Sequence, residues 1–161
     1  MIKKIKLLIC TFFCAGFLLA QESVTSSQQA VQQTVIQMFD ALSDRDTIKL
    51  RKYSTADLQL FEYGQVWNAD TLIMKAITQN QSADFKRTNT FEFINTNVDK
   101  STAWTTYSLF STITREGKQL TIQWLETVTL AKEKKQLFDI LSESKLKSEP
   151  STKKYWSFFW K

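Results

Sequence analysis

Histidine is absent from the 161 residues of this chain, and cysteine, glycine and proline are scarce. Without histidine the chain has no Ser-His-Asp or Cys-His catalytic group, lacks the commonest transition-metal ligand and lacks the usual proton carrier near neutral pH. Asp, Glu, Tyr, Lys and Arg remain as candidate proton-transfer groups. The two cysteines, Cys10 and Cys14, both lie within the first 20 residues.

Those first 20 residues are predicted to be a secretory signal peptide. Lysines at positions 3, 4 and 6 precede the uncharged run LLICTFFCAGFLLA, which ends at Ala20. The run is shorter than the roughly 20 apolar residues that cross a bilayer, so an uncleaved anchor is the less favoured alternative. We therefore expect export to the periplasm or outside the cell. The mature chain then has no thiol, disulfide or thiolate metal site.

Charge is nearly balanced outside this leader. Three of the 21 Lys and Arg residues lie in it, which leaves 18 against 16 Asp and Glu, a net charge of about +2. The formal charge of +5 therefore belongs largely to the leader, and we predict no nucleic-acid partner. We also predict no metal and no cofactor. Residues 21–148 are predicted to form one domain with one core, and residues 149–161 an aromatic tail.

The first half of the predicted domain contains three predicted helices and one predicted strand. The segment SSQQAVQQTVIQMFDAL has apolar residues at three-and-four spacing and predicts an amphipathic helix capped by Ser26 or Ser27. The segment DTIKLRKY predicts a short second helix with Ile48 and Leu50 facing inward. A strand, ADLQLFEYGQVW, follows with a turn at Gly64, and NADTLIMKAITQN predicts a third helix.

Four long β-rich runs fill the second half of the domain. They are FKRTNTFEFINTNV, TAWTTYSLFSTIT, QLTIQWLETVTLA and KQLFDILSESKL. The short charged connections DKS, REGK and KEKK separate them and suit antiparallel hairpins. Helices followed by such strands predict an α+β domain, in which a curved antiparallel sheet packs on the N-terminal helices as a cone.

Five segments carry a family resemblance: FDALSDRD, EYGQVWNADTLI, TAWTTYSL, WLETVTLAKE and LFDILSESKL. Their order and spacing, over residues 28–146, resemble the nuclear-transport-factor-2-like superfamily, particularly its secreted bacterial members. The resemblance implies a cone with a pocket at its wide end. It implies no single activity, because members serve as isomerases, cyclases, dehydratases, dimer modules and binding domains. Close relatives often carry a histidine near the end of the last strand, where this chain has Ser142.

The carboxylate of Glu126 lies on the apolar face of the predicted strand QWLETVTL. With a strand's period of two, Trp124, Glu126 and Val128 share one face. Inside a cone, ionisation of Glu126 is costly unless a cation or several hydrogen-bond donors stabilise the carboxylate. Glu62, on the apolar face of LQLFEY, is expected to approach it from another strand. The two carboxylates then serve a ligand, act as an acid/base pair, or merely satisfy buried backbone or a nearby cation such as Arg87.

The predicted ligand pocket combines these carboxylates with aromatic residues. Its members are Glu62, Trp67, Trp104, Tyr107, Trp124, Glu126 and Phe138. We predict no catalytic residue among them, and expect a secreted pocket protein that binds a small apolar ligand or a protein partner. One alternative is a cofactor-independent isomerase or dehydratase-like enzyme that uses Glu126 or Glu62, with Tyr63 or Tyr107 as hydrogen-bond donor. The other is a purely structural dimer module with a filled core.

Two further surfaces are expected to make contacts. The tail KKYWSFFWK is predicted to dock on the protein's own sheet or a partner's, in preference to a peripheral membrane contact. The outer sheet face suits either a homodimer through the sheet or a solvated surface. Its predicted members are Thr105, Thr121, Gln123, Leu125, Thr127 and Thr129.

Overall fold

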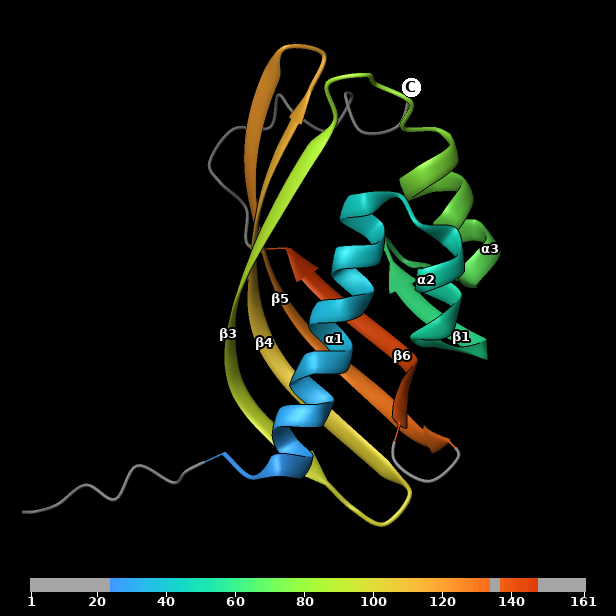
Figure 1. The fold of residues 1–161 in the computed structure, drawn as a ribbon, viewed down its shortest axis with the longest axis vertical. Helices are drawn as coiled ribbons and strands as arrows, with labels where there is room; N and C mark the ends of the chain where they lie inside the picture. Colours follow the sequence, from blue (N-terminus) through green and yellow to red (C-terminus); the bar gives the residue numbers. More distant parts are fainter. Residues whose placement is uncertain (1–23, 134–136, 148–161) are drawn as a thin grey trace, which may run out of the picture.

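The computed structural model describes residues 24–133 and 137–147, with side chains described for residues 24–132. Three helices pack on one face of a six-stranded sheet (Figure 1). The predicted leader, residues 1–20, and the predicted tail, residues 149–161, lie outside the described residues. Among the described helices, none is both long enough and apolar enough to cross a membrane.

The first helix, α1 (Ser26–Asp44), runs along the inner face of the sheet (Figure 1). Its start is a capping box in which the Thr25 hydroxyl accepts from Gln28 N at 3.3 Å and Gln28 Oε1 accepts from Thr25 N at 2.8 Å. Thr25 is therefore the cap, which corrects the prediction of Ser26 or Ser27. Most of the predicted apolar stripe is buried, with Met38 and Phe39 fully so, whereas Ala30 at its start is exposed and Ile36 is half-buried.

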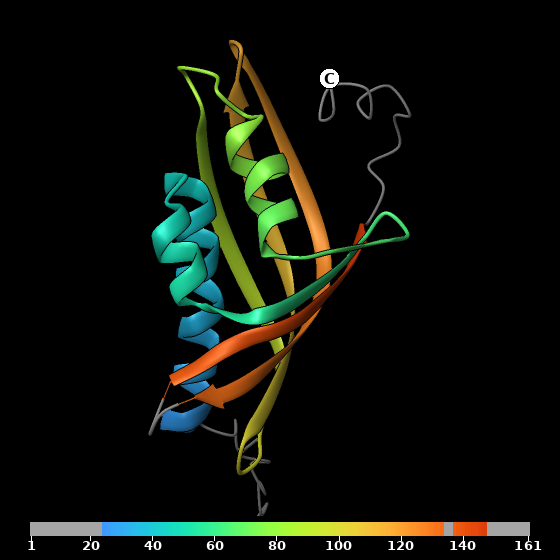
Figure 2. The ribbon, with the colours of Figure 1, turned by 90° about the vertical axis from the view of Figure 1, so that its right-hand side faces the viewer.

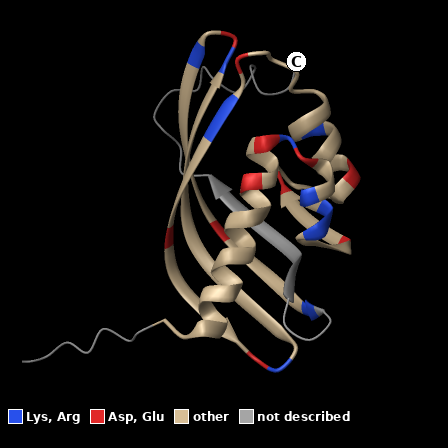
Figure 3. Ribbon diagram, viewed as in Figure 1, with Lys and Arg blue, Asp and Glu red and all other residues tan. Residues whose placement is uncertain are grey.

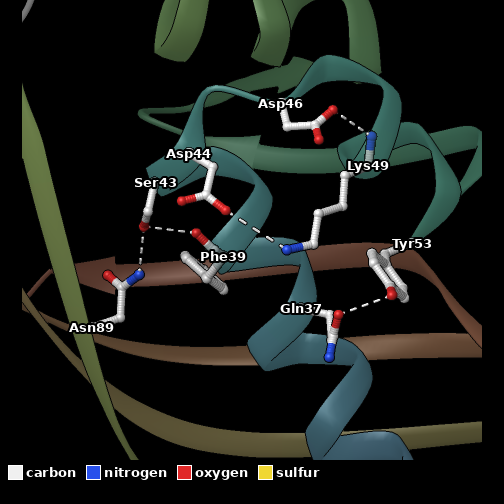
Figure 4. Close-up of polar contacts among 8 residues, drawn as sticks. All are labelled: Gln37, Phe39, Ser43, Asp44, Asp46, Lys49, Tyr53 and Asn89. Carbon is white, nitrogen blue, oxygen red and sulfur yellow. Dashed lines mark hydrogen bonds and ion pairs between the residues drawn. The ribbon is translucent and has the colours of Figure 1, made fainter.

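The second helix, α2 (Thr47–Lys52), is capped by Asp46, whose carboxylate accepts from Lys49 N at 2.8 Å (Figure 4). Leu50 is buried as predicted, but Ile48 is 83% exposed, which corrects the prediction that both face inward. Residues two positions apart on an α-helix point about 200° away from each other, so one inward residue places the other outside.

Polar contacts tie α1 to the neighbouring elements (Figure 4). Asn89 Nδ2 donates to Ser43 Oγ at 2.9 Å, which joins the end of α1 to the third strand of the chain. Tyr53 Oη donates to Gln37 Oε1 at 2.9 Å, which joins α1 to the segment after α2. Each bond crosses between elements distant in sequence, so the helix has a fixed position on the sheet.

Strands β1 (Ser54–Glu62) and β2 (Gln65–Trp67) form a tight hairpin. Its two turn residues, Tyr63 and Gly64, have φ values of 50° and 73°. Positive φ at both central positions is the type I′ geometry, which matches the twist of a two-residue hairpin. The predicted turn at Gly64 is confirmed.

The predicted third helix has two parts. Asn68 caps α3 (Ala69–Leu72), accepting from Thr71 N at 2.9 Å, and the chain continues without a break into the π-helical segment η1 (Ile73–Thr78). The wider π turn was not predicted from the sequence. Such turns are uncommon and frequently occur at functional sites, and this one forms a wall of the pocket described below.

The sheet contains β3 (Lys86–Val98), β4 (Thr102–Arg115), β5 (Lys118–Glu133) and β6 (Leu137–Lys147) in antiparallel succession. These four strands match the predicted runs. Strand β1 then pairs with β6 in parallel, giving the order β2-β1-β6-β5-β4-β3. The predicted α+β class with a curved sheet on N-terminal helices is confirmed, while the one parallel pair was not predicted. Figure 2 shows β1 and β6 side by side below α3.

Strand β4 shows how the two faces of the sheet alternate. Ala103, Thr105 and Tyr107 have no exposed surface, whereas Trp104 is 43% exposed on the outer face. Two predictions are therefore wrong: Trp104 does not face the interior, and Thr105 does not belong to the outer face. Trp104 and Tyr107 are three positions apart on one strand, so a single face cannot hold both.

Candidate functional site

A pocket of about 660 Å³ lies between α3–η1, the β1–β2 hairpin and the end of the sheet that carries the β4–β5 turn. Figure 2 shows α3 standing in front of this end of the sheet. The described residues that line the pocket are Leu42, Glu62, Tyr63, Trp67, Leu72, Lys75, Ala76, Asn80, Phe85, Arg87, Ile113, Arg115, Glu116, Lys118, Gln119, Leu120, Thr121 and Trp124.

The loop after η1 is held against the end of α1 by one arginine. Arg45 ends α1 in the left-handed conformation, with φ of 57°. Its guanidinium donates to the backbone oxygens of Asn80 and Ser82, at 3.0 and 2.8 Å, and lies 4.5 Å from the ring centroid of Phe85. Because Asn80 and Phe85 line the pocket, this contact fixes part of the pocket wall.

The β4–β5 turn at the edge of the pocket is anchored by Asp84. Its carboxylate accepts from the backbone N–H groups of Glu116 and Gly117, at 2.8 and 2.7 Å, and also from the Ser82 hydroxyl. The Ser82 hydrogen bond and the two backbone donors lower the pKa of Asp84 to about 2. The turn itself has positive φ at Glu116 (52°) and Gly117 (68°), as a two-residue hairpin requires.

Trp67 contributes an aromatic surface to the pocket. Its side chain is 5% exposed, and its indole N–H donates to Gln65 Oε1 at 3.2 Å. The Lys75 ammonium lies 4.9 Å from the centroid of the indole ring. This distance is typical of a cation–π contact, so Lys75 projects from η1 across the face of Trp67.

Arg87 occupies the opposite, sheet-side wall. The guanidinium lies 5.3 Å from the ring centroid of Phe39 and 5.7 Å from that of Trp124. It also donates to Asn89 Oδ1 at 2.9 Å and to Ser111 Oγ at 3.1 Å. These contacts from α1, β3, β4 and β5 hold the planar cation in one place beside the pocket.

Charged side chains from several elements line the pocket. Among the described lining residues, Lys75, Arg87, Arg115 and Lys118 are cationic, and Glu62 and Glu116 are acidic. Charged residues also gather at this end of the molecule in Figure 3, whereas the lower half of α1 carries few. Sequence reasoning missed the four cations, apart from Arg87, because they come from segments whose proximity depends on the tertiary fold.

Glu126 faces the interior of the sheet, as the strand alternation predicts. It is 1% exposed, and Val128 and Leu130 on the same face have no exposed surface. The Tyr107 hydroxyl donates to Glu126 Oε2 at 2.7 Å, from the position directly opposite on β4. The Tyr107 ring packs among Phe39, Phe91 and Phe93, with centroids 5.5 to 6.4 Å apart. A tyrosine in the aromatic core therefore holds this carboxylate.

The pocket brings together three of the seven predicted pocket residues: Glu62, Trp67 and Trp124. Tyr107 and Glu126 belong to the buried core and are not among the residues that line this pocket. Trp104 lies on the outer face. Phe138 lies in β6, where its side chain falls outside the described part of the chain.

Two further features bear on the chemistry of the site. Asn80 Oδ1 is buried without a hydrogen-bond partner among the described residues, so the pocket wall contains an unsatisfied acceptor. Within residues 24–133 and 137–147, His, Cys, Asp and Glu side chains form no group of three or more that could hold a metal ion.

Comparisons with known proteins agree on the architecture. No family model and no curated protein matches the sequence. Among solved structures, a nuclear transport factor 2-like superfamily protein from Salmonella enterica serovar Typhimurium aligns with TM-score 0.67 and 11% identity, over 83% of this chain and 99% of that one. A ketosteroid isomerase-like protein from Erwinia carotovora atroseptica aligns with TM-score 0.63 and 15% identity, over 78% and 99%.

An NTF2-like protein from Cytophaga hutchinsonii gives the same picture, with TM-score 0.64 and 10% identity, over 77% of this chain and all of that one (100%). Likenesses at such identities describe the fold and not the activity. The chain has the nuclear-transport-factor-2-like fold, and the fold that the sequence resemblance implies is confirmed.

Proposed function

We propose that this chain of nuclear-transport-factor-2-like fold is a secreted binding protein, which holds a small, largely apolar ligand in the pocket beside η1 without catalysing a reaction. The observation that carries the proposal is the pocket itself. Its volume of about 660 Å³ lies within the range of about 300–1,000 Å³ that small-molecule sites occupy. We propose secretion because residues 1–20 are predicted to be a signal peptide. A homodimer through the outer sheet face is also a proposal.

The character of the walls supports an apolar ligand. Trp67 and Trp124 present aromatic surface, and Leu72, Ala76 and Ile113 add aliphatic surface. Burial of apolar ligand surface contributes about 25 cal/mol per Å², so walls of this kind favour rings or alkyl chains over polar ligands. An ordered wall also lowers the entropic cost of binding, and contacts of Arg45 and Asp84 hold the adjoining loop and turn in place.

Binding is favoured over the enzymatic alternative because only one of the two candidate carboxylates lines the pocket. Glu62 lines the pocket, but Glu126 lies in the core with its carboxyl group bonded to Tyr107. An acid/base pair needs both groups within reach of one substrate. The purely structural alternative requires a filled interior, which a pocket of about 660 Å³ does not support.

A pocket-filling substitution tests this proposal. Ala76 is a half-buried lining residue on η1, so Ala76→Trp places an indole ring into the pocket. Ala30 is exposed on α1 and does not line the pocket, which makes Ala30→Trp the matched control. The probe is N-phenyl-1-naphthylamine, a neutral aromatic dye whose fluorescence rises in apolar surroundings.

The wild type is expected to bind one dye per chain. Ala76→Trp is expected to weaken binding at least tenfold, a loss of about 1.4 kcal/mol, while Ala30→Trp leaves it unchanged. Circular dichroism and thermal unfolding establish that both variants are folded. Absence of dye binding by the wild type, or equal binding by the two folded variants, would contradict the proposed function.

A further inference from the structure

We infer that the pocket has a second occupant within the chain itself: the aromatic C-terminal tail, residues 149–161, docks in the pocket and competes with the ligand. The inference rests on the proposed function, because it describes how ligand binding at that same site is regulated. It follows from the place where β6 ends, from the direction of the chain at that point and from the chemistry of the residues that come next.

Strand β6 ends at the rim of the pocket. Its last residue, Lys147, pairs with Trp124 of β5, and Trp124 lines the pocket. On its other side β6 pairs with β1 up to Phe61, and the next two residues of that hairpin, Glu62 and Tyr63, also line the pocket. Figure 2 shows this end of β6 beside the β1–β2 hairpin. Paired strands lie about 4.8 Å apart, so the tail begins beside two walls of the pocket.

The direction of β6 carries the chain along the pocket. Strands β5 and β6 are antiparallel, so a chain that leaves β6 after the Trp124–Lys147 pair moves toward the start of β5. Leu120 and Thr121, the β5 residues in that direction, line the pocket. Pro150 follows shortly after β6, has no backbone N–H for a strand ladder and favours an end to the pairing. We therefore expect the chain to leave the sheet at the pocket.

The composition of the tail matches the apolar walls. Its aromatic residues are Tyr155, Trp156, Phe158, Phe159 and Trp160. An aromatic side chain buries about 150–250 Å² when it packs, and the pocket offers it aromatic and aliphatic partners in Trp67, Leu72 and Ile113. Proteins in water rarely expose a large contiguous apolar patch, so a segment this aromatic needs a surface to cover it. A pocket of about 660 Å³ holds a drug-sized molecule and therefore has room for an aromatic side chain.

The short connection to β6 makes a weak contact effective. Residues 148–154 join β6 to Tyr155 and span at most about 25 Å when extended. A segment on so short a tether acts at an effective concentration on the order of 1 mM. A contact with a Kd of about 0.1 mM between separate molecules then fills the pocket in about nine chains of ten, and weakens a competing ligand about tenfold. The tail thus sets the affinity of the pocket, and a bound ligand displaces it.

Dye binding by variants of the mature chain, residues 21–161, tests the competition. The probe is again N-phenyl-1-naphthylamine. The ring variant, Trp156→Ser/Phe158→Ser/Phe159→Ser, removes three aromatic side chains from the tail. The matched control, Lys153→Ser/Lys154→Ser, changes the same segment and keeps every ring. The ring variant is expected to bind the dye about tenfold more tightly than the wild type, and the control to bind it with wild-type affinity. Circular dichroism establishes that both variants are folded.

Disulfide trapping locates the tail. Residues 21–161 contain no cysteine, so Ser157→Cys places a single thiol among the aromatic residues of the tail. The pocket probes are Ala76→Cys on η1 and Leu120→Cys on β5, and Thr127→Cys is the matched probe on the outer face of the sheet. A disulfide requires the two Cα atoms to come within about 7 Å. At least one pocket probe is expected to form a disulfide within one chain at least tenfold faster than Thr127→Cys, and excess dye should slow it.

The outcomes separate this inference from the proposed function. If the ring variant binds the dye no more tightly than the wild type, or if the lysine control gains as much affinity, the competition is refuted while the proposed function stands. A disulfide that forms only with Thr127→Cys, only between two chains, or with neither pocket probe also refutes docking in the pocket. If neither the folded wild type nor the folded ring variant binds the dye, the proposed function fails and the inference fails with it.

Discussion

Removal of the Tyr107 hydroxyl is the change whose effect follows most directly from the structure. In Tyr107→Phe the ring keeps its packing among Phe39, Phe91 and Phe93, but Glu126 Oε2 loses a donor at 2.7 Å. Loss of one partner of a buried hydrogen bond costs about 1 to 3 kcal/mol, because the remaining polar group stays desolvated. For a domain of this size that corresponds to a fall in Tm of roughly 4 to 12 °C.

A double-mutant cycle separates this interaction from other effects of each substitution. Glu126→Leu removes the carboxylate and leaves the tyrosine hydroxyl buried without this acceptor. In the double variant Tyr107→Phe/Glu126→Leu both polar groups are gone, so its loss of stability should be smaller than the sum of the two single losses. The expected coupling energy is about 1 kcal/mol or more, measured by urea unfolding with unchanged m-values.

The adjacent residues on the same two strands give a matched control. Thr106 and Thr127 face outward, and their hydroxyl groups lie 3.0 Å apart on the exposed face. Water replaces that hydrogen bond when one partner is removed, so the cycle Thr106→Val/Thr127→Val should couple by less than about 0.5 kcal/mol. If the Tyr107/Glu126 cycle couples no more strongly than this control, the reasoning about a buried, hydrogen-bonded carboxylate is wrong.

Three further predictions concern the turns and caps. The pKa of Asp84 is about 2 in the folded chain, against an ordinary value of 3.8, so its stabilising effect is complete above about pH 4 and is lost as the pH falls toward 2. The stability gap between wild type and Asp84→Asn should therefore close over that window in urea titrations at successive pH values. Glu116→Asn creates an Asn-Gly pair at the positive-φ turn and should raise stability by about 0.5 kcal/mol, seen as a higher urea midpoint. Thr25→Ala removes the α1 cap and should cost about 1 kcal/mol in the same assay, whereas Thr25→Ser should cost little.

The alternation of apolar and polar residues along the chain is enough to predict most strands of the sheet. The runs that became β3 to β6 have period-two patterns and short charged connections, and local hairpins need no long-range information. The inward position of Glu126 followed from the same pattern. The parallel pairing of β1 with β6 joins segments such as Leu60 and Glu143, and no local pattern specifies a pairing across that distance in sequence.

The errors at the site have equally specific causes. The aromatic ring of Trp104 suggests a pocket residue, although its position three residues before Tyr107 requires the opposite face of the strand. Lys75, Arg115 and Lys118 were not predicted at the site, because a lysine or arginine near a turn or on a short helix has the same local pattern as any solvated residue. These three residues line one pocket only because the tertiary fold brings η1 close to the β4–β5 turn.

Native mass spectrometry of the protein purified from its source organism determines whether the pocket holds a ligand. We predict that the intact chain carries one small, largely apolar ligand, which is released on denaturation. A source-expressed Ala76→Trp variant should lose that mass increment, and Ala30→Trp should keep it. A ligand of the same mass on both folded variants would contradict the assignment of the pocket as the binding site.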